Sequence, residues 1–226
     1  MINKGVWEQL SKELAADNVT LIAVSKLKQA SDIQQLYDLG QRDFGENYVQ
    51  EVAEKQPVLP ADIRWHFIGH LQSNKVKYIA SFVHLIHTVD SFKLLAEINK
   101  QAQKCGRTID VLLQMYIANE DTKYGLDEAE LTSLVALYAA RKSELQHVRI
   151  CGLMGMATNT DDEVQVRREF ASLRSCFDQL AATSFKGHSH FAVCSMGMSA
   201  DHKIAIGAGS TMVRIGSMLF GERSAH

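Results

Sequence analysis

The chain has 226 residues, of which 46% are hydrophobic and 22% charged, and its formal net charge at pH 7 is -2. This composition is typical of a globular protein long enough to bury a sizeable core, and it excludes disordered and fibrous classes. The nearly balanced charge provides no basic field for a nucleic acid or an anionic membrane, so we expect neither as a partner.

The N-terminal residues, MINKGVWEQLSKEL, place a tryptophan and leucines at helical spacing among charged residues. They contain no continuous apolar segment of the kind that a secretory signal requires, and no run in the chain approaches the ~18 apolar residues of a membrane span. We therefore expect a cytoplasmic protein. Its four cysteines form no C-x-x-C pair, which predicts small apolar or surface residues rather than disulfides or metal ligands: Cys105, Cys151, Cys176 and Cys194.

Runs rich in β-branched and apolar residues alternate with longer segments of helical period. The predicted strands cover residues 19–25, 42–47, 63–69, 84–90, 108–116, 148–154, 188–197 and 211–216. The predicted helices cover residues 31–39, 48–55, a segment after Ser73, a segment that Asp90 or Ser91 caps, 126–140, 162–182 and a short segment through Lys203 and Ile206. Gly40 follows the first of these helices as its expected C-terminal residue.

Strict alternation of strands and helices predicts an α/β fold with a parallel sheet, because parallel connections need a crossover. Eight such units in this length indicate a single closed (β/α)₈ TIM barrel over residues 1–226. An open doubly wound sheet is the alternative. The barrel is favoured because no G-x-G-x-x-G follows the first strand and no linker divides the chain into two halves.

Active sites of such barrels lie at the carboxyl ends of the strands, so residues directly after the apolar runs are candidates. These are Lys26, Asn47, His70, Asn74, Asp90 and residues 154–156, which begin with Met154. Lys26 is notable because it follows a buried run, TLIAVS, although lysine is almost never fully buried unless paired. For an arbitrary lysine, the first solvated residue after a strand is the ordinary interpretation.

The last two loops read SMGMS, residues 195–199, and RIGS, residues 214–217. Barrels frequently bind phosphate between the loops after strands seven and eight. Gly197 and Gly216 allow backbone N–H groups to approach an anion, and the serines in the two loops supply hydroxyl donors. A phosphate site opposite Lys26 suggests a phosphorylated aldehyde held as a Schiff base on that lysine.

Motifs spread over nearly the whole chain resemble those of the YggS/PROSC-type pyridoxal phosphate homeostasis proteins. The matching stretches are AVSK (23–26), FGENYVQE (44–51), WHFIGHLQSNK (65–75), HTVDS (87–91), TKYG (122–125), GLMGMAT (152–158), SMGMSAD (195–201) and GSTMVRIGSMLFG (209–221). The resemblance implies a barrel of the alanine racemase N-terminal domain type that binds pyridoxal 5′-phosphate (PLP) covalently on Lys26.

The resemblance also implies the other cofactor-binding residues. The phosphate cradle would consist of Ser195, Gly197, Met198, Ser199 and the backbone from Arg214 to Gly216. Asn47 and Met154 would flank the ring, and the Arg214 side chain would lie near the pyridine nitrogen.

The resemblance and the chain length favour a reversible PLP binder in vitamin B6 and amino-acid homeostasis over an enzyme, with no catalytic residue expected. A guanidinium beside the ring nitrogen would keep that nitrogen unprotonated and make a poor electron sink. Two alternatives stay open: a PLP-dependent amino-acid racemase or lyase, and a phosphosugar-type barrel enzyme that uses Lys26 without a cofactor. We expect a monomer, with apo PLP-dependent enzymes as partners and a relay of the cofactor through Lys28 or Lys75 as further hypotheses.

Other conspicuous side chains have ordinary interpretations. His66, His84 and His87 alternate with apolar residues in predicted strands, which indicates packed or rim histidines rather than metal ligands. Tyr116 and Tyr124 could reach the barrel mouth or pack at its edge. No metal site is expected.

Overall fold

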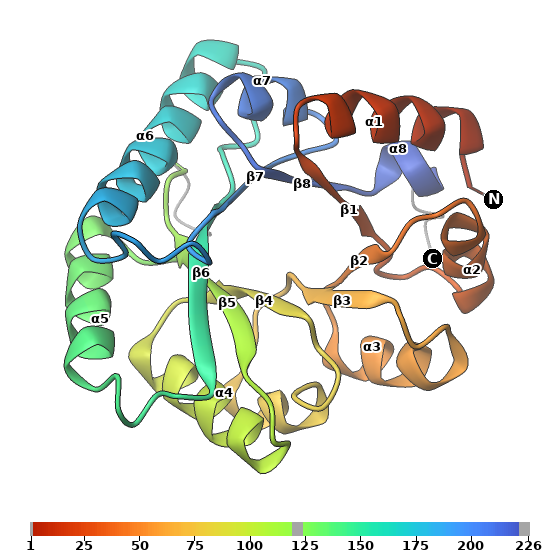
Figure 1. The fold of residues 1–226 in the computed structure, drawn as a ribbon. Coiled ribbons are helices and arrows are strands. Elements are labelled where there is room, and N and C mark those ends of the chain that lie inside the picture. Colours follow the sequence, from red (N-terminus) through yellow and green to blue (C-terminus); the bar gives the residue numbers. More distant parts are fainter. Residues whose placement is uncertain (1, 119–123, 222–226) are drawn as a thin grey trace.

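The computed structural model describes residues 2–118 and 124–221, and Figure 1 shows a ring of strands surrounded by helices. All eight strands are parallel and each pairs with the next in chain order, and the eighth pairs with the first. The strands are β1 (Thr20–Val24), β2 (Asp43–Glu46), β3 (Arg64–Phe67), β4 (Leu85–Val89), β5 (Ile109–Met115), β6 (Val148–Gly155), β7 (Val193–Met198) and β8 (Met212–Ile215). The predicted closed barrel is confirmed, and the open sheet is excluded.

The strands are joined mainly by helices that pack on the outside of the ring (Figure 1). They are α1 (Lys4–Ala16), α2 (Ala30–Asp38), α3 (Val49–Lys55), α4 (Phe92–Lys104), α5 (Glu128–Ala140), α6 (Glu163–Ala182), α7 (His202–Gly207) and α8 (Ser217–Phe220), with the short 3₁₀ helices η1 (Gln56–Val58) and η2 (Ser73–Tyr78). No helix among residues 2–118 and 124–221 combines the length and the apolarity needed to cross a bilayer.

Local sequence signals explain several helix ends. The Ser91 side chain accepts a hydrogen bond from the Leu94 N–H at the start of α4, as a helix cap does. Gly40 has φ 111° just after α2, the left-handed conformation expected of a residue that ends a helix. The segment after Ser73 is a 3₁₀ helix rather than an α-helix.

Two predicted element starts were wrong: that of the seventh strand and that of the fifth helix. The seventh strand begins at Val193, not at residue 188, because Phe191 leaves the strand direction and stacks on Phe185 at 4.2 Å between ring centroids. The fifth helix begins at Glu128 rather than Leu126, because Leu126 forms a parallel bridge with Met115 and Asp127 caps the helix through a capping box.

The barrel has two apolar regions. Buried side chains on the outer faces of the strands pack against the helices, and an inner cluster fills the barrel. The inner cluster consists of Ile22, Leu85, Leu112, Cys151, Met154 and Met212. Met154, predicted to flank a ring, is 1% exposed, so its side chain forms part of the apolar filling beneath the barrel mouth.

Candidate functional site at the carboxyl ends of the strands

Lys26 lies in a turn two residues after the end of β1 and is half-buried. β1 runs between β2 and β8, with Val24 beside Gly45 on one side and Ala23 beside Ile215 on the other. Ile22 belongs to the inner cluster, and side chains two residues apart in a strand point to the same face. Lys26 therefore leaves the carboxyl end of β1 at the barrel mouth, between the ends of β2 and β8.

Buried side chains of β2 and α3 fasten the backbone on both sides of Lys26. The Ser25 hydroxyl donates a hydrogen bond to Glu46 Oε1 at 2.6 Å, and Lys55 Nζ donates to the Ser25 carbonyl at 2.9 Å and to Glu46 Oε1 at 2.7 Å. On the far side of Lys26, the Leu27 N–H donates to Glu51 Oε1 at 2.6 Å. We call Ser25, Glu46, Glu51 and Lys55 the turn clamp.

The turn clamp contains a carboxyl group in an unusual environment. Glu46 is 0% exposed, and burial raises its pKa to about 7 against the opposing charge and hydrogen bond of Lys55. One oxygen of Glu46 and one of Glu51 have no hydrogen-bond partner among the described residues. Sequence reasoning missed the clamp, although Glu51 and Lys55 stand at the i,i+4 spacing of a helical ion pair.

Asn47 follows β2 directly and is therefore next to Lys26 along the rim. Its Oδ1 atom is buried and has no hydrogen-bond partner within the described part of the chain. A buried polar atom of this kind is normally paired, so the oxygen is a candidate hydrogen-bond acceptor for a bound group at this rim.

The loops after β7 and β8 contact each other across the barrel rim. The Gly216 N–H donates to Ser199 Oγ at 3.3 Å, and a Cβ on Gly216 would lie 3.3 Å from Val24 Cβ in β1. Gly197, predicted in a loop, is near the end of β7; it has φ 97°, and a Cβ there would lie 2.6 Å from Ala205 Cβ, so the strand end requires glycine at this position. The sequence-predicted residues Ser199 and Gly216 are therefore in contact, and Gly216 lies beside β1, whereas Gly197 is in β7 and faces α7 and Val213 of β8.

Two predicted cradle groups are engaged within the protein. The Met198 N–H donates to Asp201 Oδ1 at 2.6 Å, while the Met198 side chain is partly exposed. Ser195 is fully buried inside the barrel, and its hydroxyl accepts a hydrogen bond from Arg214 Nη1 at 2.6 Å. Among the predicted cradle residues, Ser195 thus lies deepest.

Arg214 is buried in the middle of β8, beside Ile22 of β1. Its guanidinium also donates to the carbonyls of Ser195 and Gly155, both at 3.0 Å. Burial lowers its pKa to about 10, with the charge of Asp201 acting in the opposite direction. The guanidinium is therefore protonated at neutral pH.

Other predicted rim residues line a separate hollow. His70, Asn74 and Asp90 border a cavity of about 680 Å³ between η2 and the start of α4. The ring of Tyr124 stacks on that of His70 at 4.7 Å, so this tyrosine is at the rim. Thr122 and Lys123 of the TKYG motif lie outside the described residues.

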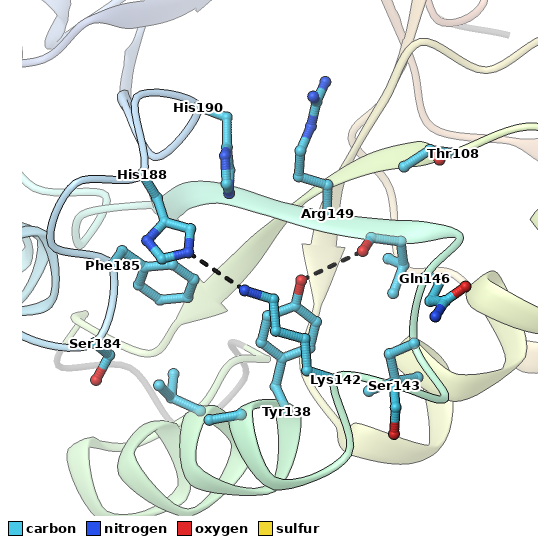
Figure 2. Close-up of a pocket in the computed structure, with 14 residues that line it drawn as sticks. Thr108, Tyr138, Lys142, Ser143, Gln146, Arg149, Ser184, Phe185, His188 and His190 are labelled. Carbon is cyan, nitrogen blue, oxygen red and sulfur yellow. Dashed lines mark hydrogen bonds between the residues drawn. The ribbon is translucent and has the colours of Figure 1, made fainter.

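A second cavity, of about 630 Å³ (Figure 2), is lined by Thr108 and Val148, and therefore lies at the amino ends of β5 and β6. It is formed by the end of α5, the start of β6 and residues 184–190, and contains the hydrogen bonds of Lys142 with His188 and of Tyr138 with the Val148 carbonyl. Because Thr108 precedes β5, this cavity is far along the strands from Lys26.

Cysteines and histidines do not form a metal centre in the part of the chain that the structure describes. Cys151 and Cys194 are buried, and burial raises the pKa of each thiol to about 12. His66 and His87 are buried, whereas His84 directly precedes β4 and lies at the amino ends of the strands.

Comparisons with known proteins agree with this geometry. The family model for the alanine racemase N-terminal domain matches residues 7–224. The pyridoxal phosphate homeostasis protein of Escherichia coli K12 is 40% identical over 211 residues, which cover 92% of this chain and 87% of that protein. The pyridoxal phosphate homeostasis protein of Pasteurella multocida is 40% identical over 210 residues, covering 91% and 87%.

The chain belongs to the pyridoxal phosphate homeostasis protein family. A solved structure of the family member PipY from Synechococcus elongatus, with PLP bound, is 35% identical and matches with a TM-score of 0.83 over 96% of this chain and 100% of that chain. The family assignment thus agrees with the barrel, and the resemblance seen in the sequence motifs is confirmed.

Proposed function

We propose that this protein binds PLP at the carboxyl ends of its strands and holds it covalently through Lys26. In this role it acts in cytoplasmic PLP and amino-acid homeostasis without appreciable catalysis. The observation that carries the proposal is that Lys26, Asn47 Oδ1 and the Ser199–Gly216 loop contact lie at one rim, and that Asn47 Oδ1 has no hydrogen-bond partner among the described residues. PLP bound to PipY supports the choice of ligand.

Each part of the proposed site suits one part of PLP. Lys26 supplies the amine for the aldehyde, and the glycine and serine loops after β7 and β8 supply backbone and hydroxyl donors for the phosphate. Asn47 Oδ1 supplies a hydrogen-bond acceptor beside the ring, and Met154 the apolar floor below it. PLP, when bound, supplies an electrophilic aldehyde and an aromatic ring that can withdraw electrons.

The environment of Arg214 favours a carrier over an enzyme. We place its guanidinium near the ring nitrogen, where a group that stays protonated at neutral pH donates a hydrogen bond but not its proton. An unprotonated ring nitrogen withdraws electrons poorly, and racemases and lyases of amino acids depend on that withdrawal. Arg214 therefore disfavours amino-acid chemistry.

Lys26→Ala tests covalent binding, and Lys28→Ala is its matched control because Lys28 is two residues away and its Nζ donates instead to the Phe220 carbonyl at 3.1 Å. We expect wild type and Lys28→Ala to develop a visible absorbance band with PLP, and borohydride reduction followed by peptide mass spectrometry to locate the adduct on Lys26. Lys26→Ala should show no band. A band retained by Lys26→Ala, or an adduct mapped to Lys28, would contradict the proposal.

Two further assays separate the homeostatic role from catalysis. The loaded protein should transfer PLP to an apo PLP-dependent enzyme and restore its activity, and common amino acids should not turn over faster than with free PLP. Rapid turnover that Lys26→Ala abolishes would establish the racemase or lyase alternative instead.

A further inference from the structure

A continuous set of hydrogen-bonded side chains crosses the inside of the barrel from Arg214 to Asp43. Arg214 Nη1 is 2.6 Å from Ser195 Oγ, which is 3.4 Å from His87 Nδ1. His87 Nε2 is 3.0 Å from His66 Nδ1, and His66 Nε2 is 2.9 Å from Asp43 Oδ1. We call these five residues the interior chain.

The interior chain connects strands that are not neighbours in the sheet. Arg214 and Ser195 lie on the adjacent strands β8 and β7, and His66 and Asp43 lie on the adjacent strands β3 and β2. His87 is on β4, so its contact with Ser195 of β7 spans the inside of the barrel. Asp43 is the first residue of β2, so the interior chain ends at the amino ends of the strands.

Donor chemistry gives the interior chain one direction. A guanidinium only donates and a carboxylate only accepts, so Ser195 Oγ accepts from Arg214 and the His66 Nε2–H donates to Asp43. The hydroxyl hydrogen of Ser195 can then donate to His87 Nδ1. The proton of His87 is in that case on Nε2, from which it donates to His66 Nδ1. Both imidazoles are neutral in this arrangement, and every hydrogen bond points from Arg214 toward Asp43.

The charged groups around the interior chain agree with this direction. Burial lowers the pKa of His87 well below its usual 6.5, and the charge of Arg214 acts in the same direction. Within residues 2–118 and 124–221, the guanidinium of Arg214 donates its hydrogen bonds to neutral oxygens of Ser195 and Gly155. Asp43 lies at the other end, where Arg64 Nε donates to it at 2.7 Å.

We propose that the interior chain positions Arg214 for PLP, with His87 and His66 as positioning residues and Asp43 as the remote anchor that fixes their tautomers. This inference rests on the proposed function, because it assigns Arg214 to the ring nitrogen. It means that a carboxylate at the amino ends of the strands controls how firmly the guanidinium is held against the cofactor at the barrel mouth.

Asp43→Asn tests the proposal, and Asp110→Asn is the matched control. Asp110 also forms a carboxylate–guanidinium pair at the amino ends of the strands, with Arg149 at 2.7 and 2.8 Å, but it has no place in the interior chain. We expect Asp43→Asn to weaken PLP affinity about fivefold and to shift the visible band of the bound cofactor, as mutations in a coupled network do. Asp110→Asn should stay within about twofold of wild type.

Thermal unfolding of both variants without PLP separates positioning from simple destabilisation. A comparable loss of stability in the two variants, with PLP affinity and band position changed only in Asp43→Asn, supports the interior chain. Equal affinities and unshifted bands in both variants would overturn it, because Asp43 would then have only a structural role.

Nitrogen NMR of the histidines tests the interior chain without PLP, so its failure is distinguishable from failure of the proposed function. We expect His66 and His87 each to carry a proton on Nε2 and none on Nδ1. A proton on Nδ1 of either ring, or a charged imidazolium at His87, would overturn the one-way arrangement even if Lys26 binds PLP. Asp43→Asn should alter the His66 signals, whereas Asp110→Asn should not.

Discussion

Leu27, the residue after Lys26, has φ 62° and a side chain that is 61% exposed. A non-glycine residue in this left-handed region is strained by about 1–2 kcal/mol. The strain persists because Glu51 accepts the Leu27 N–H and the turn clamp fixes Ser25 on the other side of Lys26. Because Lys26 is the proposed PLP-binding lysine, we interpret the strain next to it as a sign that the turn is held for that side chain rather than for stability.

Leu27→Gly tests this interpretation. Glycine relieves the left-handed strain of ~1–2 kcal/mol but loses ~0.5–1 kcal/mol through greater freedom in the unfolded state. We therefore expect the free energy of unfolding, measured with urea, to rise by up to ~1 kcal/mol, while PLP affinity falls because the turn is less fixed. Asn18→Gly is the control, since Asn18 also has a positive φ but lies before β1. Loss of stability in Leu27→Gly would contradict the argument.

Between elements, the turn clamp joins the end of β1 to β2 and α3 through a buried carboxyl group. Burial raises the pKa of Glu46 to about 7 from an ordinary value of 4.5. Between pH 4.5 and about 7, the folded state therefore binds more protons at Glu46 than the unfolded state does. The stability that the raised pKa of Glu46 contributes is complete below pH 4.5 and is lost as pH rises through about 7. The free energy of unfolding, measured with urea at a series of pH values, should fall between these two pH values in the wild type. Glu46→Gln should remove that fall.

Asp43→Asn provides a control of opposite sign. Burial opposes ionisation of Asp43, but hydrogen bonds from Arg64 and His66 outweigh it and hold its pKa below the ordinary 3.8. The stability that ionised Asp43 contributes is present above pH 3.8 and is lost on further acidification. Asp43→Asn should therefore change the pH dependence of the free energy of unfolding only at acid pH. If the free energy of unfolding of Glu46→Gln changed with pH between 4.5 and 7 as it does in the wild type, Glu46 would not titrate in this range.

The elements that sequence patterns predicted well are those specified by local signals. Alternating apolar runs predicted all eight strands. The ends of the first two runs placed Lys26 and Asn47 just past the carboxyl ends of β1 and β2, where the structure has them. The seventh strand was extended too far because His188 to Phe191 alternate like a strand, while Phe191 in fact stacks on Phe185. Stacking between residues of one loop leaves no periodic signal.

The missed parts of the candidate site depend on pairs that are distant in sequence. Ser25 meets Glu46, and His87 meets Ser195 from 108 positions away. Each of these side chains has an ordinary local interpretation as a strand or rim residue. Their joint role depends on the barrel register, which brings β2 beside β1 and sets β4 opposite β7.

At the scale of the whole molecule, the proposed site bridges the seam where the barrel closes. β1 and β8 pair at four positions from Thr20 with Met212 to Ala23 with Ile215, and the loops that would hold the phosphate come from β7 and β8. A ligand attached to Lys26 at one side and to these loops at the other ties the first strand to the last two. Binding to the folded state alone also stabilises it by mass action.

We therefore expect PLP at about one hundred times its Kd to add ~2.7 kcal/mol to stability, which corresponds to a rise in Tm of ~5–10 °C for a chain of this size. Pyridoxal at the same concentration, which lacks the phosphate, should raise the Tm much less, and PLP should protect amides of β1 and β8 from hydrogen exchange most strongly. Equal shifts with pyridoxal and PLP would contradict a phosphate site in the last two loops, because the aldehyde alone would then account for the binding. Protection confined to β3 and β4 would place the ligand in the hollow beside His70 instead of at the seam.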